Sequence, residues 1–151
     1  MKQLSIIIVT YNSEKDIYDC LTSVYQYNDI GENLEVIVVD NQSRDFHCMK
    51  NNIEQQYPTV KIVQNTKNGG YGQGNNVGIA MASAPFVAIM NPDIRLIMPM
   101  FSRIVQCLQQ QDVAMCAGKQ LDSNRRVFTS FFSLFTVPWW IGKPIEYLSR
   151  R

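Results

Sequence analysis

Short runs rich in Ile and Val alternate in this chain with longer amphipathic segments. Two of these runs, Leu4–Val9 and Leu34–Val39, are apolar at every position but one. Strands of a parallel sheet have this composition because helices cover both faces of the sheet. Parallel strands also need crossover helices, which the amphipathic segments supply. The pattern therefore predicts an α/β fold with a mostly parallel central sheet flanked by helices.

The boundaries of the expected elements follow from the same periodicities. Ser13 is the expected N-cap of the first helix, with Asp16 completing a capping box. Pro58 should stop the second helix. We expect strands over residues 4–9, 34–40, 60–63, 86–90 and 113–117. We expect helices over residues 13–28, 45–57, 74–82 and 97–111.

Composition narrows the class of protein. The chain of 151 residues is long enough for one domain, and its 46% hydrophobic and 18% charged residues are typical of a globular protein. The net charge of +1 argues against a general nucleic-acid binder. Four scattered cysteines and one histidine argue against a structural zinc site and favour free thiols in a reducing cytoplasm. No apolar stretch reaches the roughly 20 residues of a spanning helix, so we expect a soluble, cytoplasmic protein.

Polar or glycine-rich segments follow four of the expected strands. In open parallel α/β sheets, ligands bind beyond the carboxyl ends of the strands, and these ends share one edge of the sheet. We therefore expect the four segments to converge on one ligand site. They are Thr10–Asn12, Asp40–Ser43, Asn65–Gly74 and Asn91–Asp93.

Each segment offers a chemical group that suits a nucleotide. The ring of Tyr11 can stack on a base, and Asp40 can accept a hydrogen bond from the imide N–H of uracil or thymine. The glycines at 69, 70, 72 and 74 allow the backbone to approach a ligand, and amide N–H groups there favour phosphate. Asp93 is a hard oxygen ligand for Mg²⁺ or Mn²⁺.

Structural roles remain open for the same residues. Asp40 with the residues after it also fits a turn or a helix cap, and Asn91-Pro92-Asp93 fits a strand-to-helix turn. Tyr11 equally fits a packed aromatic residue, and the glycine run fits a turn. Two other nucleotide sites are excluded, because neither a G-x-G-x-x-G fingerprint after the first strand nor a Walker G-x-x-x-x-G-K-[ST] pattern is present.

The four segments together resemble glycosyltransferase family 2. The likeness rests on the motifs S-I-I-I-V-T-Y-N from Ser5, V-V-D-N-Q-S from Val38, N-G-G-Y-G-Q-G-N-N-V-G from Asn68 and N-P-D from Asn91. It covers roughly residues 4–122 in the order and spacing of the family. The chain is most similar to the rhamnosyltransferase-like branch, in which N-P-D stands where many relatives carry D-x-D.

This resemblance implies a Rossmann-like GT-A fold and an inverting glycosyltransferase. The donor would be a dTDP- or UDP-sugar, with dTDP-rhamnose as one candidate, and the acceptor a polysaccharide or a lipid-linked saccharide. The implied cofactor is Mg²⁺ or Mn²⁺, with Asp93 as its direct ligand. The donor-binding residues expected are Thr10, Tyr11, Asn12, Asp40, Asn41, Ser43, Asn68, Gly70, Tyr71, Gly74, Asn76 and Asn91.

The catalytic base is not assigned. The family places it downstream, in an acidic motif followed by a helix, whereas the acidic residues after Asp93 are Asp112, Asp122 and Glu146, none in such a motif. We therefore expect residues 1–118 to form the donor-binding domain and residues 119–151 to begin an acceptor-side region whose remainder is missing. The alternatives are an inactive fragment that binds nucleoside diphosphate and metal, and a remnant that binds neither.

The end of the chain is basic and aromatic. Residues 118–151 hold six of the 14 Lys and Arg residues but only two of the 13 acidic ones. The aromatic stretch Phe131–Trp140 fits a surface that packs against an acceptor half, or a lipid-facing surface at the inner face of the plasma membrane. Both interpretations predict self-association through this stretch.

Overall fold

The computed structural model describes residues 1–122, 124–128, 132–133 and 148–149. The chain forms two compact units, Met1–Cys116 and Ala117–Arg151, and each is treated by itself. Among the described residues, no helix is both long and apolar enough to cross a membrane.

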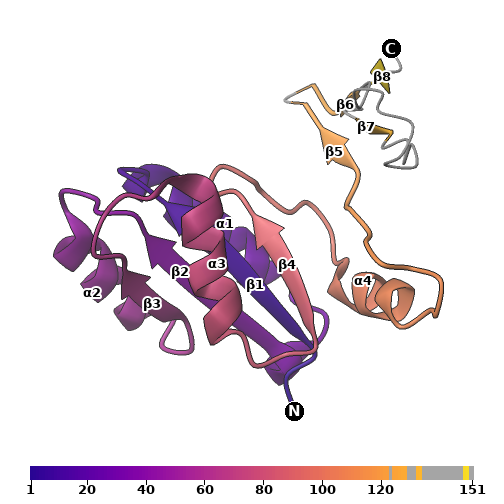
Figure 1. The fold of residues 1–151 in the computed structure, drawn as a ribbon, viewed down its shortest axis with the longest axis horizontal. Coiled ribbons are helices and arrows are strands. Elements are labelled where there is room, and N and C mark those ends of the chain that lie inside the picture. Colours follow the sequence, from indigo (N-terminus) through magenta and orange to yellow (C-terminus); the bar gives the residue numbers. More distant parts are fainter. Residues whose placement is uncertain (123, 129–131, 134–147, 150–151) are drawn as a thin grey trace, which may run out of the picture. The chain divides into compact units, whose positions relative to one another are not determined.

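The first unit is built on a parallel sheet of four strands in the order β3-β2-β1-β4, all pointing toward the same end (Figure 1). The strands are β1 (Leu4–Thr10), β2 (Leu34–Asp40), β3 (Lys61–Gln64) and β4 (Phe86–Met90). Every residue of β1 and β2 is buried, because helices cover both faces of the two central strands. The expected α/β fold with a mostly parallel sheet is therefore confirmed.

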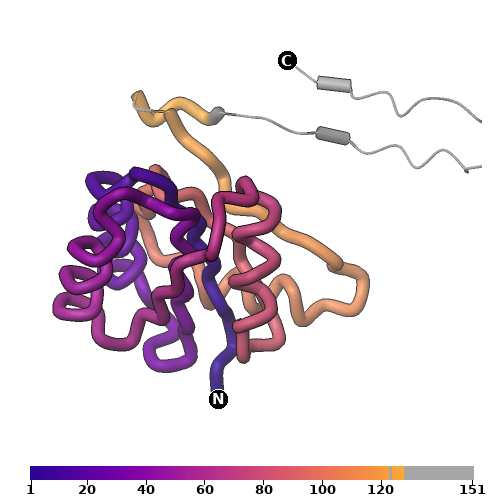
Figure 2. The backbone as a smooth tube through the Cα atoms, turned by 60° about the vertical axis from the view of Figure 1, so that its left-hand side comes forward, coloured from indigo at the N-terminus to yellow at the C-terminus, as the bar shows by residue number. Residues whose placement is uncertain are grey.

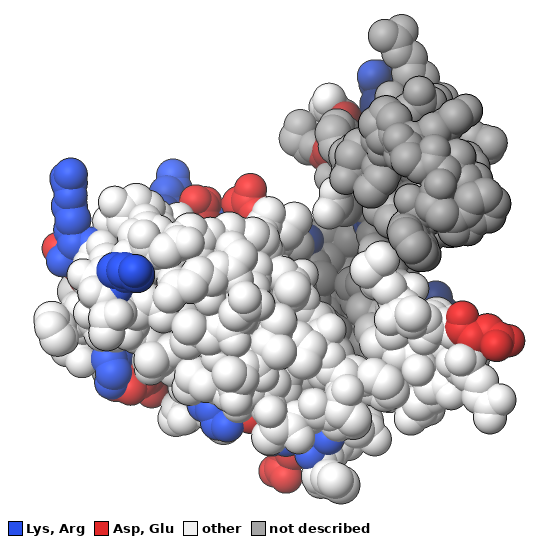
Figure 3. Space-filling model, in the orientation of Figure 1, with Lys and Arg blue, Asp and Glu red and all other residues white. Residues whose placement is uncertain are grey.

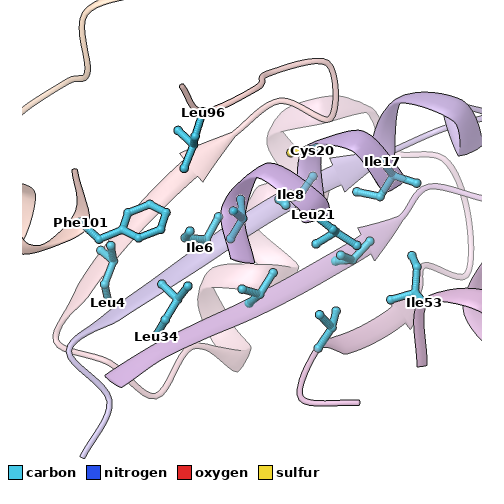
Figure 4. Close-up of a cluster of buried hydrophobic side chains, with 14 of the residues drawn as sticks. Leu4, Ile6, Ile8, Ile17, Cys20, Leu21, Leu34, Ile53, Leu96 and Phe101 are labelled. Carbon is cyan, nitrogen blue, oxygen red and sulfur yellow. The ribbon is translucent and has the colours of Figure 1, made fainter. Parts of the chain in front are cut away.

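Helices lie on both sides of this sheet (Figure 2). They are α1 (Glu14–Gln26), the short 3-10 turn η1 (Gly31–Asn33), α2 (Phe46–Gln56), α3 (Gly70–Met81) and α4 (Phe101–Leu108). The larger core cluster joins α1, α2 and α4 to one face of β1 and β2 through Leu, Ile and Phe side chains (Figure 4). A smaller cluster around Ile7 and Ile37 lies under α3 on the other face.

Four expectations about local structure differ from what the structure shows. The third helix begins at Gly70 rather than at residue 74, so most of the glycine run is its first turn. Residues 113–117 form no strand, because no described strand pairs with them. The capping box at Ser13 is also not formed, since the Ser13 hydroxyl donates to the Tyr11 carbonyl instead of accepting from the helix. The helix expected over residues 97–111 is shorter, at Phe101–Leu108.

A buried carboxylate anchors the amino end of the sheet. Glu35 accepts hydrogen bonds from the Ser5 hydroxyl, from the backbone and hydroxyl of Ser83, and from the Lys61 ammonium at 2.7 Å. Burial would raise the pKa of Glu35, but the Lys61, Ser5 and Ser83 contacts outweigh it and lower this pKa to about 2. The cluster fixes the turn between α3 and β4, and with it the position of α3.

The second unit contains short antiparallel strand pairs. β5 (Gln120–Leu121) pairs with β6 (Val127–Phe128), and β7 (Phe132–Ser133) pairs with β8 (Leu148–Ser149). Asp122 closes the first hairpin, because its Oδ1 accepts the backbone N–H groups of Asn124 and Arg126. Most of the aromatic stretch 131–140, on which the self-association and membrane predictions depend, lies outside the described residues.

Candidate functional site

The carboxyl ends of β1, β2 and β3 lie side by side. Thr10 is the register partner of Asp40, and Asp40 is the partner of Gln64. The ladder continues one step beyond the strands, since the Asn41 N–H donates to the Thr10 carbonyl and the Asn65 N–H to the Asp40 carbonyl, each at 2.8 Å. Parallel register therefore brings the first three predicted segments to one edge of the sheet.

Asp40 is fully buried at this edge with one oxygen unsatisfied. Its Oδ2 accepts the Ser43 N–H at 2.9 Å and the Gln64 side-chain amide at 3.1 Å, but its Oδ1 has no partner among the described residues. The buried hydroxyl of Thr10 on the adjacent strand also lacks a partner there. Buried polar atoms without partners cost about 1–3 kcal/mol each and are rare in folded proteins. A ligand at this edge could supply the hydrogen-bond partners that these two neighbouring atoms lack.

Hydrogen bonds of Asn41 connect the end of β2 to the start of α3. Its side chain donates to the Gly70 carbonyl at 3.0 Å and accepts from the Asn65 amide at 2.6 Å. Gly70 has φ +82°, in the left-handed region that favours glycine, and nothing lies where its Cβ would be. The polar groups of Asn41 are thus used to hold the α3 start in place.

A second link joins the loop after β1 to the loop after β2. The Asn12 N–H donates to the Ser43 hydroxyl at 2.8 Å, and the Arg44 N–H donates to Asn12 Oδ1 at 3.0 Å. Asn12 and Gln42 both have positive φ, 49° and 70°, so the chain turns sharply after each strand. Asn12 and Ser43 therefore join the loop after β1 to the loop after β2, just as Asn41 joins the end of β2 to α3.

Two tyrosines are exposed around these strand ends. The side chain of Tyr11 is 51% exposed and that of Tyr71, in the first turn of α3, is 48% exposed. Tyr11 is therefore not a packed core residue, and its ring is free to stack on a flat ligand. Asn76 on α3 is exposed as well.

The start of α3 has backbone N–H groups beyond Gly70 for which no side-chain partner is found among the described residues. The N-cap residue Gly69 has no side chain to cap the helix, and the first N–H of α3, that of Gly70, is bonded to Asn68 Oδ1 at 3.0 Å. Such a helix start favours an anionic group. Neither α3 nor β4 carries a charged side chain, and Figure 3 shows this face largely free of Lys, Arg, Asp and Glu.

Gly74 has a packing role. A Cβ built on it would lie 2.7 Å from Val9 Cγ1 and 3.2 Å from Asn41 Oδ1, and one built on Gly78 would lie 2.3 Å from Ile7 Cγ2. Larger residues at these two positions would push the helix off the sheet. The glycine at 74 thus brings α3 into contact with β1, while Gly70 shapes the loop.

The Asn91-Pro92-Asp93 segment forms a turn after β4, closed by a hydrogen bond from the Ile94 N–H to the Asn91 carbonyl at 3.2 Å. Asn91 and Asp93 are exposed, and Asp93 forms no ion pair among the described residues. Across all the residues that the structure describes, no three His, Cys, Asp or Glu side chains lie close enough together to hold a metal ion. The donor set fits a Mg²⁺ or Mn²⁺ ion held by one carboxylate, which takes its remaining ligands from phosphate and water.

Three residues of this region were missed by the sequence analysis. Asn75 is buried on α3, and its Oδ1 has no partner in the described part of the chain. Gln64 donates to Asp40, and Arg95 contacts the Asn91–Asp93 turn. Gln64 could have been found from its place at the end of the third strand. The contacts of Asn75 and Arg95 depend on side-chain packing that has no sequence pattern.

Comparisons with known proteins agree with this arrangement. The family model "Glycosyl transferase family 2" matches residues 5–148. The poly(ribitol-phosphate) beta-glucosyltransferase of Bacillus spizizenii is 32% identical over 93 residues, which cover 60% of this chain and 15% of that protein. An uncharacterized glycosyltransferase of Haemophilus influenzae is 28% identical over 120 residues, which cover 79% of this chain and 36% of that protein. The chain therefore spans well under half of the length of these relatives.

Solved structures share the fold. TarS 1–349 of S. aureus in complex with UDP aligns with a TM-score of 0.62 at 28% identity, over 70% of this chain and 32% of that one. The mannosyltransferase PcManGT of Pyrobaculum calidifontis, in complex with GDP-Man and Mn²⁺, aligns with a TM-score of 0.68 at 23% identity, over 74% of this chain and 33% of that one. The sheet matches that of GT-A glycosyltransferases. With its family model matched over nearly all of its length, the chain belongs to glycosyl transferase family 2.

Proposed function

We propose that this chain binds a nucleoside-diphosphate sugar at the carboxyl ends of its strands and forms the donor-binding part of a glycosyltransferase. The observation that carries the proposal is the buried Oδ1 of Asp40, which has no partner among the described residues. It lies on the strand next to the one that leads into the exposed ring of Tyr11. A flat base could stack on the Tyr11 ring and donate an N–H at its edge to Asp40 Oδ1.

The proposed base is uracil or thymine, because each has an imide N–H for Asp40 Oδ1 to accept. The Thr10 hydroxyl, for which the described residues also offer no partner, would bond a neighbouring polar atom of the base. The N–H groups at the start of α3 would face the diphosphate. The UDP complex of the S. aureus relative supports this choice of base.

Asp93 is the proposed ligand of Mg²⁺ or Mn²⁺, with the neutral Asn91 beside it. Asp93 would hold the ion, which would supply positive charge against the departing nucleoside diphosphate. The Mn²⁺ in the structure of the mannosyltransferase supports a metal-dependent site in the same fold. The chain itself would supply the Asp93 carboxylate, which forms no ion pair within the described residues.

The proposed reaction is a direct displacement with inversion. An acceptor hydroxyl forms a bond to the anomeric carbon while the bond from that carbon to the diphosphate oxygen breaks, and the hydroxyl proton passes to a base. The N-P-D motif supports dTDP-rhamnose as one candidate donor. The names of the poly(ribitol-phosphate) transferases support a polysaccharide or lipid-linked acceptor. Such acceptors favour a cytoplasmic enzyme with peripheral contact to the inner face of the plasma membrane.

A second candidate function is binding without transfer. After Asp93 the described acidic residues are Asp112 and Asp122, and the Asp122 carboxylate already closes the β5–β6 turn. This observation favours a chain that holds nucleoside diphosphate and metal but offers no base for an acceptor within the described residues. Hydrolysis and transfer assays with UDP-GlcNAc and dTDP-rhamnose separate the two functions.

Titration calorimetry of the full chain with UDP and dTDP, with Mn²⁺ and with EDTA, tests the proposal. We expect Mn²⁺ to tighten nucleotide binding to the wild type. In Asp93→Ala this gain in affinity should be smaller by about tenfold or more, the usual scale for loss of metal-site contacts. Asp112→Ala, which removes an exposed carboxylate elsewhere, is the matched control and should bind like the wild type. Binding that is unchanged by Asp93→Ala would show that the metal site lies elsewhere.

A further inference from the structure

One face of α1 holds the segment that follows β4. Residues 16, 19, 20 and 23 of α1 are three, four and seven positions apart, so they share that face. Each contacts the 91–96 segment. The contacts are Asp16 and Asp19 to Arg95 at 3.5 and 3.1 Å, the Cys20 thiol to the Asn91 carbonyl at 3.7 Å, and the Leu96 N–H to the Ser23 hydroxyl at 3.0 Å.

Arg95 is the centre of these contacts. Its Nη1 donates to the carbonyls of Pro92 and Ile94, each at 3.2 Å, while its Nη2 donates to Asp19. Pro92 and Ile94 are the chain neighbours of Asp93 on its two sides. One guanidinium therefore holds the peptide group between Pro92 and Asp93 and the one between Ile94 and Arg95, and ties both to α1. A lysine ammonium lacks the planar fork that makes these contacts together.

We propose that Arg95 is a positioning residue for Asp93, clamping the Asn91–Asp93 turn onto α1 so that the carboxylate points to the metal. The inference rests on the proposed function. It also links the two halves of the site, because α1 begins directly after the Thr10–Asn12 segment. A rigid α1 thus sets the distance between the base contact and the metal contact.

The charges around Arg95 suit this role. Asp16 and Asp19 on α1 occupy the guanidinium, whereas Asp93 forms no ion pair within the described part of the chain. The negative charge of Asp93 thereby remains available to a cation. Asp16 and Asp19 are 50% and 65% exposed, so these ion pairs contribute little to stability. The effect of losing them should be found in metal-dependent binding rather than in the melting temperature.

The test compares UDP binding to the full chain in Mn²⁺ and in EDTA, and takes the ratio of the two Kd values as the metal enhancement. For Arg95→Lys we expect this enhancement to fall about tenfold, the scale found for residues that orient metal ligands, with the Kd in EDTA unchanged. Asp19→Asn should move it in the same direction. Arg103→Lys, an exposed arginine on α4, is the matched control. Circular dichroism melts establish that each variant is folded.

Each outcome decides the inference. Arg95→Lys with a wild-type enhancement would overturn it, and so would an equal loss of affinity in Mn²⁺ and in EDTA, which indicates general disruption of the site. If Mn²⁺ enhances UDP binding to the wild type and to Arg95→Lys, but not to Asp93→Asn, only the role of Arg95 is rejected. The proposed function is then intact. A wild type that binds no UDP overturns both.

Discussion

Replacing Asp40 by asparagine should convert the site from one that prefers UDP to one that prefers CDP. Asp40 Oδ2 accepts two N–H donors, from Ser43 and Gln64, so the asparagine carbonyl would take that position. The NH₂ group would then stand where Oδ1 now lacks a partner. Uracil presents an N–H at its N3 position and would meet another donor, whereas cytosine presents an acceptor there.

The expected change is large because the atom concerned is buried. A buried polar group left unpaired costs about 1–3 kcal/mol, so UDP should bind roughly 10- to 100-fold more weakly to Asp40→Asn. Competition titrations with UDP and CDP measure the preference of each variant, and Asp112→Asn, exposed and remote in sequence, controls for the change in charge. An unchanged UDP-to-CDP ratio in Asp40→Asn would mean that Asp40 does not read the base.

Adding one methyl group to Gly78 should destabilise the fold by about 2–3 kcal/mol, near the upper end for overpacking a core. The new Cβ would lie 2.3 Å from Ile7 Cγ2 and 3.2 Å from Val39 Cγ2. Ile7 and Val39 are fully buried in the centre of the sheet and have no space to withdraw. The loss should therefore exceed the roughly 1 kcal/mol that alanine gains over glycine within a helix.

Gly72→Ala is the matched control on the same helix. Nothing lies within 4 Å of a Cβ at Gly72, so this variant should be as stable as the wild type or more stable by up to about 1 kcal/mol. Urea unfolding followed by circular dichroism gives both free energies of unfolding. If Gly78→Ala proves no less stable than Gly72→Ala, α3 does not pack on β1 as closely as the structure has it.

The sheet was predictable because its strands carry their own signal. β1, β2 and β4 fall where continuous apolar runs predict them. For β1 and β2 the reason is that helices cover both of their faces. The run at 113–117 shows the limit of this reasoning, since a strand also needs a hydrogen-bonding partner. Whether a partner exists depends on the fold and not on the run itself.

The start of α3 was not predictable for a different reason. Five glycines between residues 69 and 78 have low helix propensity, and they indicate a loop. The helix forms because Gly74 and Gly78 let its backbone contact Val9 and Ile7. Tertiary packing thus outweighs local propensity, and such packing cannot be read from a window of sequence.

The position of the candidate site was predictable, but the division of roles within it was not. Parallel strands bring their carboxyl ends to one edge of the sheet, where Thr10 and Asp40 are register partners. Whether a polar side chain faces a ligand or bonds its own chain depends on partners far away in sequence. Asn41 and Ser43, for example, are bonded to residues about 30 positions away.

The ¹H–¹⁵N correlation spectrum of the labelled full chain, recorded during titration with UDP and Mg²⁺, tests most directly whether the carboxyl edge of the sheet is the donor site. We predict that the largest shift changes fall on Tyr11 and Asn12, on Asp40–Ser43, on Gly70–Gly72 and on Asn91 and Asp93. The amides around Glu35 and Ser83 at the opposite edge should stay in place and serve as the internal reference. Shift changes centred on that opposite edge, or none at saturating UDP, would contradict a nucleotide-sugar site at the carboxyl ends of the strands.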